Sequence, residues 1–120
     1  MEYEGEILLA RAKGWPDKWF GLITGFLERD ETPEEGIVRE VREELGLTAV
    51  VASLVGVYTF VERNELIIAY HVHAHGTIEL GVELEAVKSV ARDRLRPWPF
   101  GTGLAVKDWL ARATQSAEMS

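Results

Sequence analysis

Residues 25–47 read GFLERDETPEEGIVREVREELGL, and the interpretation of the whole sequence starts from this stretch. Within it, TPEE predicts the start of a helix: Thr32 is the N-cap, a proline takes the first helical position, and Glu35 returns a hydrogen bond to the backbone of the cap. Gly46 can adopt the left-handed conformation that ends helices. The pattern therefore predicts a helix over residues 33–45.

Three glutamates crowd one face of this helix. Glu40, Glu43 and Glu44 stand at i, i+3 and i+4, so their Cβ atoms lie within about 6 Å of one another and their charges repel. A hard divalent cation such as Mg²⁺ or Mn²⁺ would offset this repulsion, since these ions take oxygen ligands. The alternative is a solvated acidic face on which Arg39 pairs with Glu43. Gly36 costs the helix about 1 kcal/mol relative to alanine, so we expect another backbone or a ligand to lie close to its first turns.

The composition fits one compact domain of 120 residues, 47% of them hydrophobic, without cysteine. The absence of thiols excludes disulfides and thiolate metal sites. The net charge is −7, and residues 25–47 hold eight acidic residues against three arginines, which disfavours nucleic acid or an anionic membrane as a partner. No apolar run reaches membrane length and the N-terminus is acidic, unlike a signal peptide, so we expect a cytoplasmic protein.

The rest of the sequence predicts a mixed α/β domain. Apolar and β-branched runs indicate strands over residues 7–12, 19–23, 50–60 and 66–74. Residues 83–94 fit either kind of element, and residues 103–112 indicate a closing amphipathic helix. We therefore expect a single domain over residues 1–112, followed by a flexible polar tail over residues 113–120.

Residues 25–47 resemble the signature box of the Nudix hydrolases. That box reads Gly, five residues, Glu, seven residues, then Arg-Glu-aliphatic-any-Glu-Glu-any-Gly-aliphatic. Every fixed position matches; the matching residues are Gly25, Glu31, Arg39, Glu40, Val41, Glu43, Glu44, Gly46 and Leu47. The resemblance implies a Nudix-type α/β/α sandwich around a mixed β-sheet. It also implies a loop–helix–loop that holds Mg²⁺ or Mn²⁺ against the diphosphate of a nucleotide.

The resemblance further implies a role for each residue of the box. Glu43 and Glu44 would be the principal metal ligands, and Glu40 would be a further ligand or the group that activates water. The full set of metal ligands would be Glu40, Glu43, Glu44 and the carbonyl oxygen of Gly25. Arg39 would orient a carboxylate, and the structural residues of the box would be Glu31 and Gly46. The residues expected to act in catalysis are Glu40, Glu44, Arg39 and Glu85.

Glu85 enters this set as the proton acceptor. In the family this group can lie in the box or on a later loop, and a bound cation makes the box carboxylates poor acceptors by lowering their pKa. Glu83 and Glu85 follow the last expected strand, and we favour Glu85 because Glu83 directly follows Gly81 and Val82, at what we expect to be a mobile loop tip. The alternative is that both are ordinary surface glutamates.

Substrate-binding candidates lie near the N-terminus, where Arg11, Trp19 and Phe20 could contact phosphate or stack on a base. The blocks that mark the NADH-cleaving, ADP-ribose and diadenosine-polyphosphate groups of the family are missing from their usual positions. The sequence therefore leaves the nucleotide substrate open.

Three histidines alternate at His71, His73 and His75, so on a strand they would share one face and could bind a transition metal. We interpret them instead as a half-exposed sheet face, because no other type of ligand lies near them in the sequence.

The N-terminus departs from the family pattern. A strand usually precedes the one that resembles residues 7–12, yet only six residues precede Ile7. We expect either a sheet that lacks its usual first strand or an edge covered by another chain. An exposed edge strand invites pairing, which makes a homodimer the candidate protein partner.

The sequence thus predicts a divalent-metal-dependent hydrolase that acts on a small-molecule nucleotide. It would cleave a pyrophosphate linkage in a nucleoside diphosphate linked to another moiety or in a nucleoside triphosphate. The alternative is a non-catalytic nucleotide-binding or regulatory module with the same fold. The complete carboxylate set favours the enzyme, because a binding module has little reason to retain three crowded glutamates.

Overall fold

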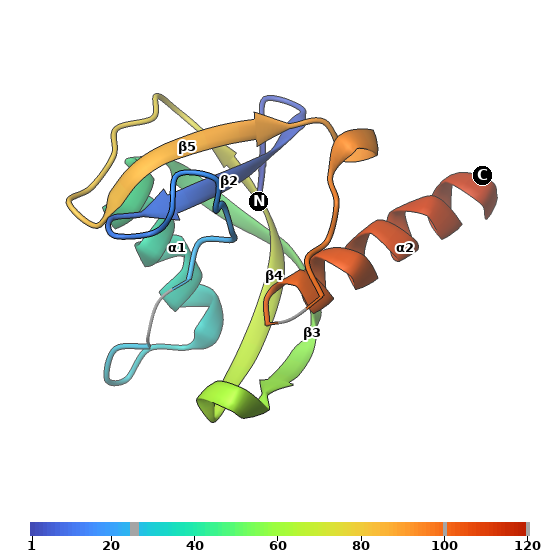
Figure 1. Cartoon of the computed structure of the whole chain (residues 1–120), viewed down its shortest axis with the longest axis horizontal. Coiled ribbons are helices and arrows are strands. Elements are labelled where there is room, and N and C mark those ends of the chain that lie inside the picture. Colours follow the sequence, from blue (N-terminus) through green and yellow to red (C-terminus); the bar gives the residue numbers. More distant parts are fainter. Residues whose placement is uncertain (25–26, 100, 120) are drawn as a thin grey trace.

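The computed structural model describes residues 1–24, 27–99 and 101–119 (Figure 1). The chain forms, in order, β1 (Glu2–Tyr3), β2 (Glu6–Ala12), α1 (Pro33–Leu45), β3 (Thr48–Phe60), η1 (Val61–Arg63), β4 (Glu65–His75), β5 (Leu84–Val90), η2 (Arg92–Arg94) and α2 (Gly103–Met119), where η marks a short 3₁₀ helix. Within these ranges, no helix combines the length and the apolar character that a membrane span needs.

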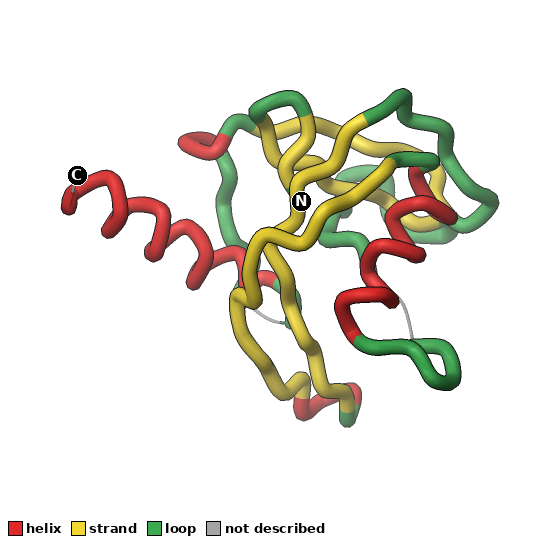
Figure 2. The backbone as a smooth tube through the Cα atoms, turned by 180° about the vertical axis from the view of Figure 1, so that it is seen from behind, coloured by secondary structure: helices red, strands yellow, loops and turns green. Residues whose placement is uncertain are grey.

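The strands form one mixed sheet in the order β3-β4-β1-β2-β5. β1 runs antiparallel to β2 and parallel to β4, and the other neighbours are antiparallel. β3 and β4 make a long hairpin whose register shifts between Val51 and Ser53 and again between Leu54 and Gly56. Figure 2 shows the far end of this hairpin projecting beyond the rest of the sheet.

The two helices cover opposite faces of this sheet. Successive side chains of a strand point to opposite faces, so Leu8 packs with Val41 and Leu45 of α1, whereas Leu9 packs with Val106 of α2. Burial of these apolar faces is what holds the helices on the sheet. The resulting three layers are the α/β/α sandwich that the sequence predicted.

Several predicted elements differ in extent. The strand expected at residues 19–23 is reduced to one antiparallel bridge between Gly21 and Ala10. The ambiguous segment 83–94 forms β5 and then η2. The closing helix continues to Met119, so the backbone of residues 113–119 is helical, in keeping with the good helix formers among them. The flexibility that we expected of this tail stays a prediction.

The structure corrects the expectation of a missing first strand. β1 is present as two residues at the centre of the sheet, where Glu2 pairs with Ile7 of β2 and with His73 of β4. Such a short strand suffices because Glu4 and Gly5, both with positive φ, return the chain at once into β2. Among the described strands, β3 and β5 therefore form the edges, and the strand at residues 7–12 is internal.

Candidate active site

Helix α1 begins and ends as the sequence predicted. The side chain of Thr32 accepts a 3.2 Å hydrogen bond from the backbone N–H of Glu35, whose carboxylate accepts one of 3.1 Å from the N–H of Thr32. Gly46 ends the helix in the left-handed conformation, with φ 69°. A close approach occurs at Gly36, but from a side chain rather than from the backbone or ligand that we expected: a Cβ there would lie 2.7 Å from a methyl group of Leu27. Gly36 thus serves loop packing.

Arg39 is the centre of an ion-pair network around the helix. Its guanidinium binds both carboxylate oxygens of Glu31, at 2.8 and 3.0 Å. It also lies 3.0 Å from an oxygen of Glu40, 3.1 Å from Glu43 and 3.5 Å from Glu28. Two-point binding fixes the plane of the guanidinium. The hydrogen bond from Arg39 lowers the pKa of Glu31. Arg39 thus links glutamates of the preceding loop to glutamates of the helix and fixes their relative positions.

Glu44 is the buried carboxylate of the helix, with 8% of its surface exposed. Its pKa is raised to about 7, first by burial and then by the negative charge of Glu40, and also by those of Glu83 and Glu43. A hydrogen bond between the side chains of Glu44 and Glu40 contributes as well. The charges of the other three glutamates thus act on Glu44, and we call the four residues the carboxylate cluster: Glu40, Glu43, Glu44 and Glu83.

Glu83 reaches this cluster because the loop after β4 is docked on α1. The backbone N–H of Gly81 donates a 2.8 Å hydrogen bond to the carbonyl oxygen of Glu44, which satisfies a group left without a partner at the helix end. A Cβ on Gly81 would lie 2.5 Å from the carbonyl oxygen of Glu43, a separation that real Cβ atoms do not show. Only glycine permits this approach, and Gly81 is therefore packed against the helix rather than placed at a free loop tip.

Glu85 lies in a different environment, on β5. Its carboxylate is 3.8 Å from the guanidinium of Arg11. Arg11 also donates a 2.9 Å hydrogen bond to the carbonyl of Asp17 and lies 5.4 Å from the ring centroid of Phe20. The ammonium group of Lys88 is 4.5 Å from the same ring. Phe20 is thus flanked by two cations, and Glu85 pairs with one of them.

The predicted site residues therefore fall into two groups. One is the carboxylate cluster with Arg39 and Glu31, and the other surrounds Phe20. The ends of β2 and β5 connect the groups, because Ala12 pairs with Leu84 and the N–H of Lys13 donates a 3.0 Å hydrogen bond to the carbonyl of Glu83. Phe20 itself packs with Leu9 on the α2 face of the sheet, opposite α1. Trp19 is 61% exposed. Gly25, the expected carbonyl ligand, lies outside the described residues.

Gly81 is a site residue that sequence reasoning missed. A glycine between two strands is typical of any turn, so its type carried no special signal. Its role depends on the main chain of Glu43 and Glu44, more than 35 residues earlier. No local pattern could have shown that contact.

The charge and the donor atoms of the carboxylate cluster suit a divalent cation. Burial and crowding raise the pKa of Glu44 to about 7, because they make its ionised form unfavourable. A positive ion among the carboxylates would stabilise that ionised form. All four side chains offer carboxylate oxygens, the donor type that Mg²⁺ and Mn²⁺ prefer. A cation held in this way can neutralise negative charge on phosphate oxygens and lower the pKa of a bound water. The arrangement can therefore support hydrolysis of a phosphate anhydride.

The chain resembles known proteins in sequence. The family model that matches the chain is described as the NUDIX domain and covers residues 1–109. The ADP-ribose pyrophosphatase of Methanocaldococcus jannaschii is 46% identical over 65 residues, which are 53% of this chain and 38% of that protein. The NAD-capped RNA hydrolase NudC of Pseudomonas aeruginosa is 30% identical over 118 residues, or 94% of this chain and 42% of that protein. The chain thus spans about two fifths of the length of these curated relatives.

Solved structures share the fold. A NUDIX hydrolase from Nitrosomonas europaea superposes with a TM-score of 0.78 at 21% identity, covering 95% of this chain and 68% of that one. A MutT NUDIX hydrolase from Burkholderia pseudomallei superposes with a TM-score of 0.67 at 28% identity, covering 88% of each chain. The first likeness concerns the fold alone.

Proposed function

Because the chain belongs to the Nudix family, we propose that it hydrolyses a pyrophosphate linkage in a nucleotide. The substrate would be a nucleoside diphosphate linked to another moiety or a nucleoside triphosphate. The observation that carries this proposal is the carboxylate cluster, in which a buried Glu44 is crowded by its neighbours and Arg39 orients Glu40 and Glu43. Crowded carboxylates are costly unless a cation joins them, and such a cation promotes hydrolysis of an anhydride.

The metal would be Mg²⁺ or Mn²⁺, held by the carboxylates of Glu40, Glu43 and Glu44, and we keep the carbonyl of Gly25 as a further proposed ligand. When bound, such an ion neutralises phosphate charge and makes water more acidic. Arg39 contributes by holding two of these carboxylates in fixed positions. No covalent nucleophile is required of the protein.

In the proposed reaction a water molecule attacks one phosphorus of the linkage. A new P–O bond forms, the bond from that phosphorus to the bridging oxygen breaks, and the proton of the water passes to a glutamate. We assign the acceptor to the segment that holds Glu83 and Glu85. The sequence favoured Glu85, but the effect of Glu83 on Glu44 and the pairing of Glu85 with Arg11 make Glu83 our first choice.

We propose that the nucleotide binds along β2 and the start of β5. Trp19 offers an exposed indole for stacking on a base, and Phe20 lies between Arg11 and Lys88, whose charges suit phosphate. The names of the relatives suggest ADP-ribose and NAD-capped RNA as substrates to test. We favour a small nucleotide over RNA because a net charge of −7 opposes binding to a long polyanion.

A substrate panel tests the proposal. The chain is incubated with Mg²⁺ or Mn²⁺ and ADP-ribose, NADH, diadenosine polyphosphates, nucleoside triphosphates or NAD-capped RNA, and products are followed by ³¹P NMR. We expect phosphate monoester products from at least one small nucleotide, and none after chelation of the metal. Tight nucleotide binding without turnover of any member would favour the alternative of a non-catalytic nucleotide-binding module.

Two further proposals concern partners and location. The edge strand β3 exposes three apolar side chains, those of Val50, Leu54 and Val57. We therefore propose that a homodimer would form through this strand. Sedimentation velocity would show whether the chain is a dimer in solution. We also propose a cytoplasmic location.

A further inference from the structure

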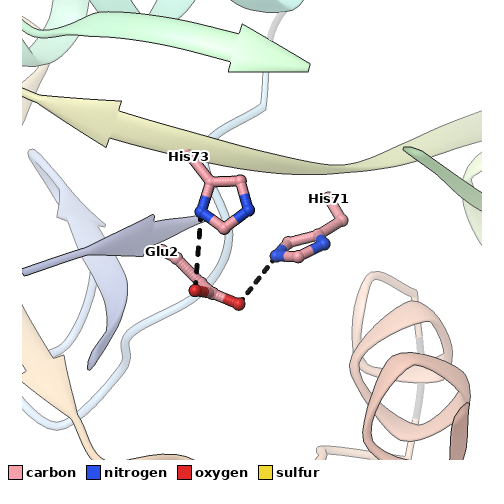
Figure 3. A group of neighbouring side chains, drawn as sticks. All are labelled: Glu2, His71 and His73. Atoms are coloured by element: carbon pink, nitrogen blue, oxygen red, sulfur yellow. Dashed lines mark hydrogen bonds and ion pairs between the residues drawn. The ribbon is translucent and has the colours of Figure 1, made fainter. Parts of the chain in front are cut away.

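A second group of metal-ligating side chains lies at the centre of the sheet, formed by Glu2 of β1 and by His71 and His73 of β4 (Figure 3). Nε2 of His71 lies 2.8 Å from Oε1 of Glu2, and Nδ1 of His73 lies 3.5 Å from Oε2. One ligand atom from each of the three residues lies within 4.8 Å of the others. The three side chains converge on one point.

Strand pairing explains this convergence. β1 and β4 are parallel neighbours, and their register places Glu2 opposite His73. His71 is two residues earlier on β4 and therefore projects from the same face of the sheet. The imidazole of His71 contacts the ring of Trp109 in α2, with 5.2 Å between the centroids. The group therefore lies on the α2 face, and the sheet separates it from α1 and its glutamates.

We propose that Glu2, His71 and His73 form a zinc-binding site, independent of the proposed hydrolytic site. Two imidazole nitrogens and one carboxylate oxygen are a donor set that Zn²⁺ accepts readily and that Mg²⁺ does not favour. Three protein ligands leave the fourth tetrahedral position to water. Glu2 and His71 have side chains only 18% exposed, whereas that of His73 is 57% exposed, so two ligands are held by packing and the third is open to entering metal.

Two charged groups adjoin this site, the guanidinium of Arg92 and the N-terminal amino group of Met1, and the site must accommodate both. Nη2 of Arg92 donates a 3.0 Å hydrogen bond to Oε1 of Glu2, and the guanidinium lies 4.7 Å from the ring of Trp109. Oε1 is therefore occupied by Arg92, while Oε2 faces His73 and is the oxygen that would bind zinc. His71 would turn its Nε2 from Oε1 toward the ion. A carboxylate held through its other oxygen is the usual arrangement for a ligating residue.

The competing interpretation is that Glu2 and the two histidines only link β1 to β4 through hydrogen bonds and bind no metal. Titration of Zn²⁺ into the full chain by calorimetry, in excess Mg²⁺ to occupy the carboxylate cluster, separates the two. His73→Ala removes the most exposed ligand and is the main variant. His75→Ala is the matched control, because His75 is an exposed histidine on the same strand and outside the group of three. Glu2→Gln is a second variant that removes the carboxylate ligand.

We expect the wild type to bind one Zn²⁺ and to gain thermal stability from it, and His75→Ala to behave in the same way. His73→Ala and Glu2→Gln should each weaken binding by at least about tenfold to a hundredfold. Co²⁺ should give a visible tetrahedral spectrum that His73→Ala loses. Circular dichroism of each metal-free variant confirms that it is folded. The proposal would be overturned if the wild type bound zinc no more tightly than His73→Ala does. It would also be overturned if His75→Ala lost as much zinc affinity as His73→Ala.

Discussion

The backbone N–H of Gly81 lies 2.8 Å from the carbonyl oxygen of Glu44, so the loop after β4 is hydrogen-bonded to the last turn of the glutamate-bearing helix. This bond brings Glu83 close enough to raise the pKa of Glu44. The buried carboxylate thus depends on two segments that are distant in sequence. Disturbing the loop should alter the site without touching any proposed ligand.

Gly81→Ala tests this coupling. The added Cβ would meet the main chain of Glu43 at 2.5 Å, so the loop must move away from the helix. We expect a loss of about 1–3 kcal/mol in the free energy of unfolding, together with lower turnover. Gly21→Ala is the control, because its Cβ would make only an ordinary 3.5 Å contact with Trp15. Equal stability and activity for the two variants would show that the close approach at Gly81 is unimportant.

Glu44 makes stability depend on pH. Its pKa of about 7 in the folded chain exceeds the ordinary value of 4.5, so the folded state binds the proton more tightly than the unfolded state does. The resulting stabilisation is complete below about pH 4.5 and is lost as pH rises through about 7. We therefore expect Glu44→Gln to be more stable than the metal-free wild type at pH 8, by roughly 1–3 kcal/mol.

Urea unfolding at several pH values between about 5 and 8 measures this difference. Glu34→Gln, which changes an exposed carboxyl group in the first turn of the same helix, is the control and should follow the wild type. If the difference between Glu44→Gln and the wild type did not change with pH, the raised pKa of Glu44 would be contradicted.

Arg39→Lys should lower both the melting temperature and the turnover number. Lysine keeps the charge but cannot bind Glu31 through two parallel hydrogen bonds while also reaching Glu40 and Glu43. Calorimetry and steady-state kinetics measure the two effects. Arg42→Lys, an exposed position on the same helix, should leave both unchanged. An Arg39→Lys variant that matched Arg42→Lys would show that the network has no role in positioning.

Local patterns in the sequence were sufficient for α1. Its N-cap, capping box and left-handed C-cap all depend on neighbours within a few residues, and all are present. The three-layer fold followed from the resemblance of residues 25–47 to a known box. The short strand β1 could not be predicted, because two residues show no periodicity and its pairing partners lie on other strands.

The sites likewise depend on contacts between distant segments, which local sequence patterns do not show. Crowding of Glu40, Glu43 and Glu44 follows from helical spacing, but burial of Glu44 depends on the docked loop. The histidines were interpreted as a sheet face because no other ligand was near them in the sequence. Their partner Glu2 is 69 residues from His71 and reaches it only through strand pairing.

Glu83→Gln and Glu85→Gln distinguish the two candidates for the proton acceptor. We expect Glu83→Gln to lower the rate of the chemical step by about 10²-fold or more with little change in metal affinity. Glu85→Gln should alter the rate only a few-fold, since Glu85 pairs with Arg11. Single-turnover kinetics with saturating metal measures both. The opposite ranking would restore Glu85, and a few-fold effect in both would move the acceptor to Glu40.

The most direct test of the proposed hydrolytic site compares wild type and Glu44→Gln in hydrolysis of the best substrate of the panel, over a range of Mg²⁺ concentrations. Calorimetric titration of Mn²⁺ reports metal binding in the same samples. We expect Glu44→Gln to stay folded, to bind metal more weakly and to turn over at least about 10²-fold more slowly at limiting Mg²⁺. Near-wild-type turnover by Glu44→Gln at limiting Mg²⁺ would contradict the assignment of the carboxylate cluster as the hydrolytic site.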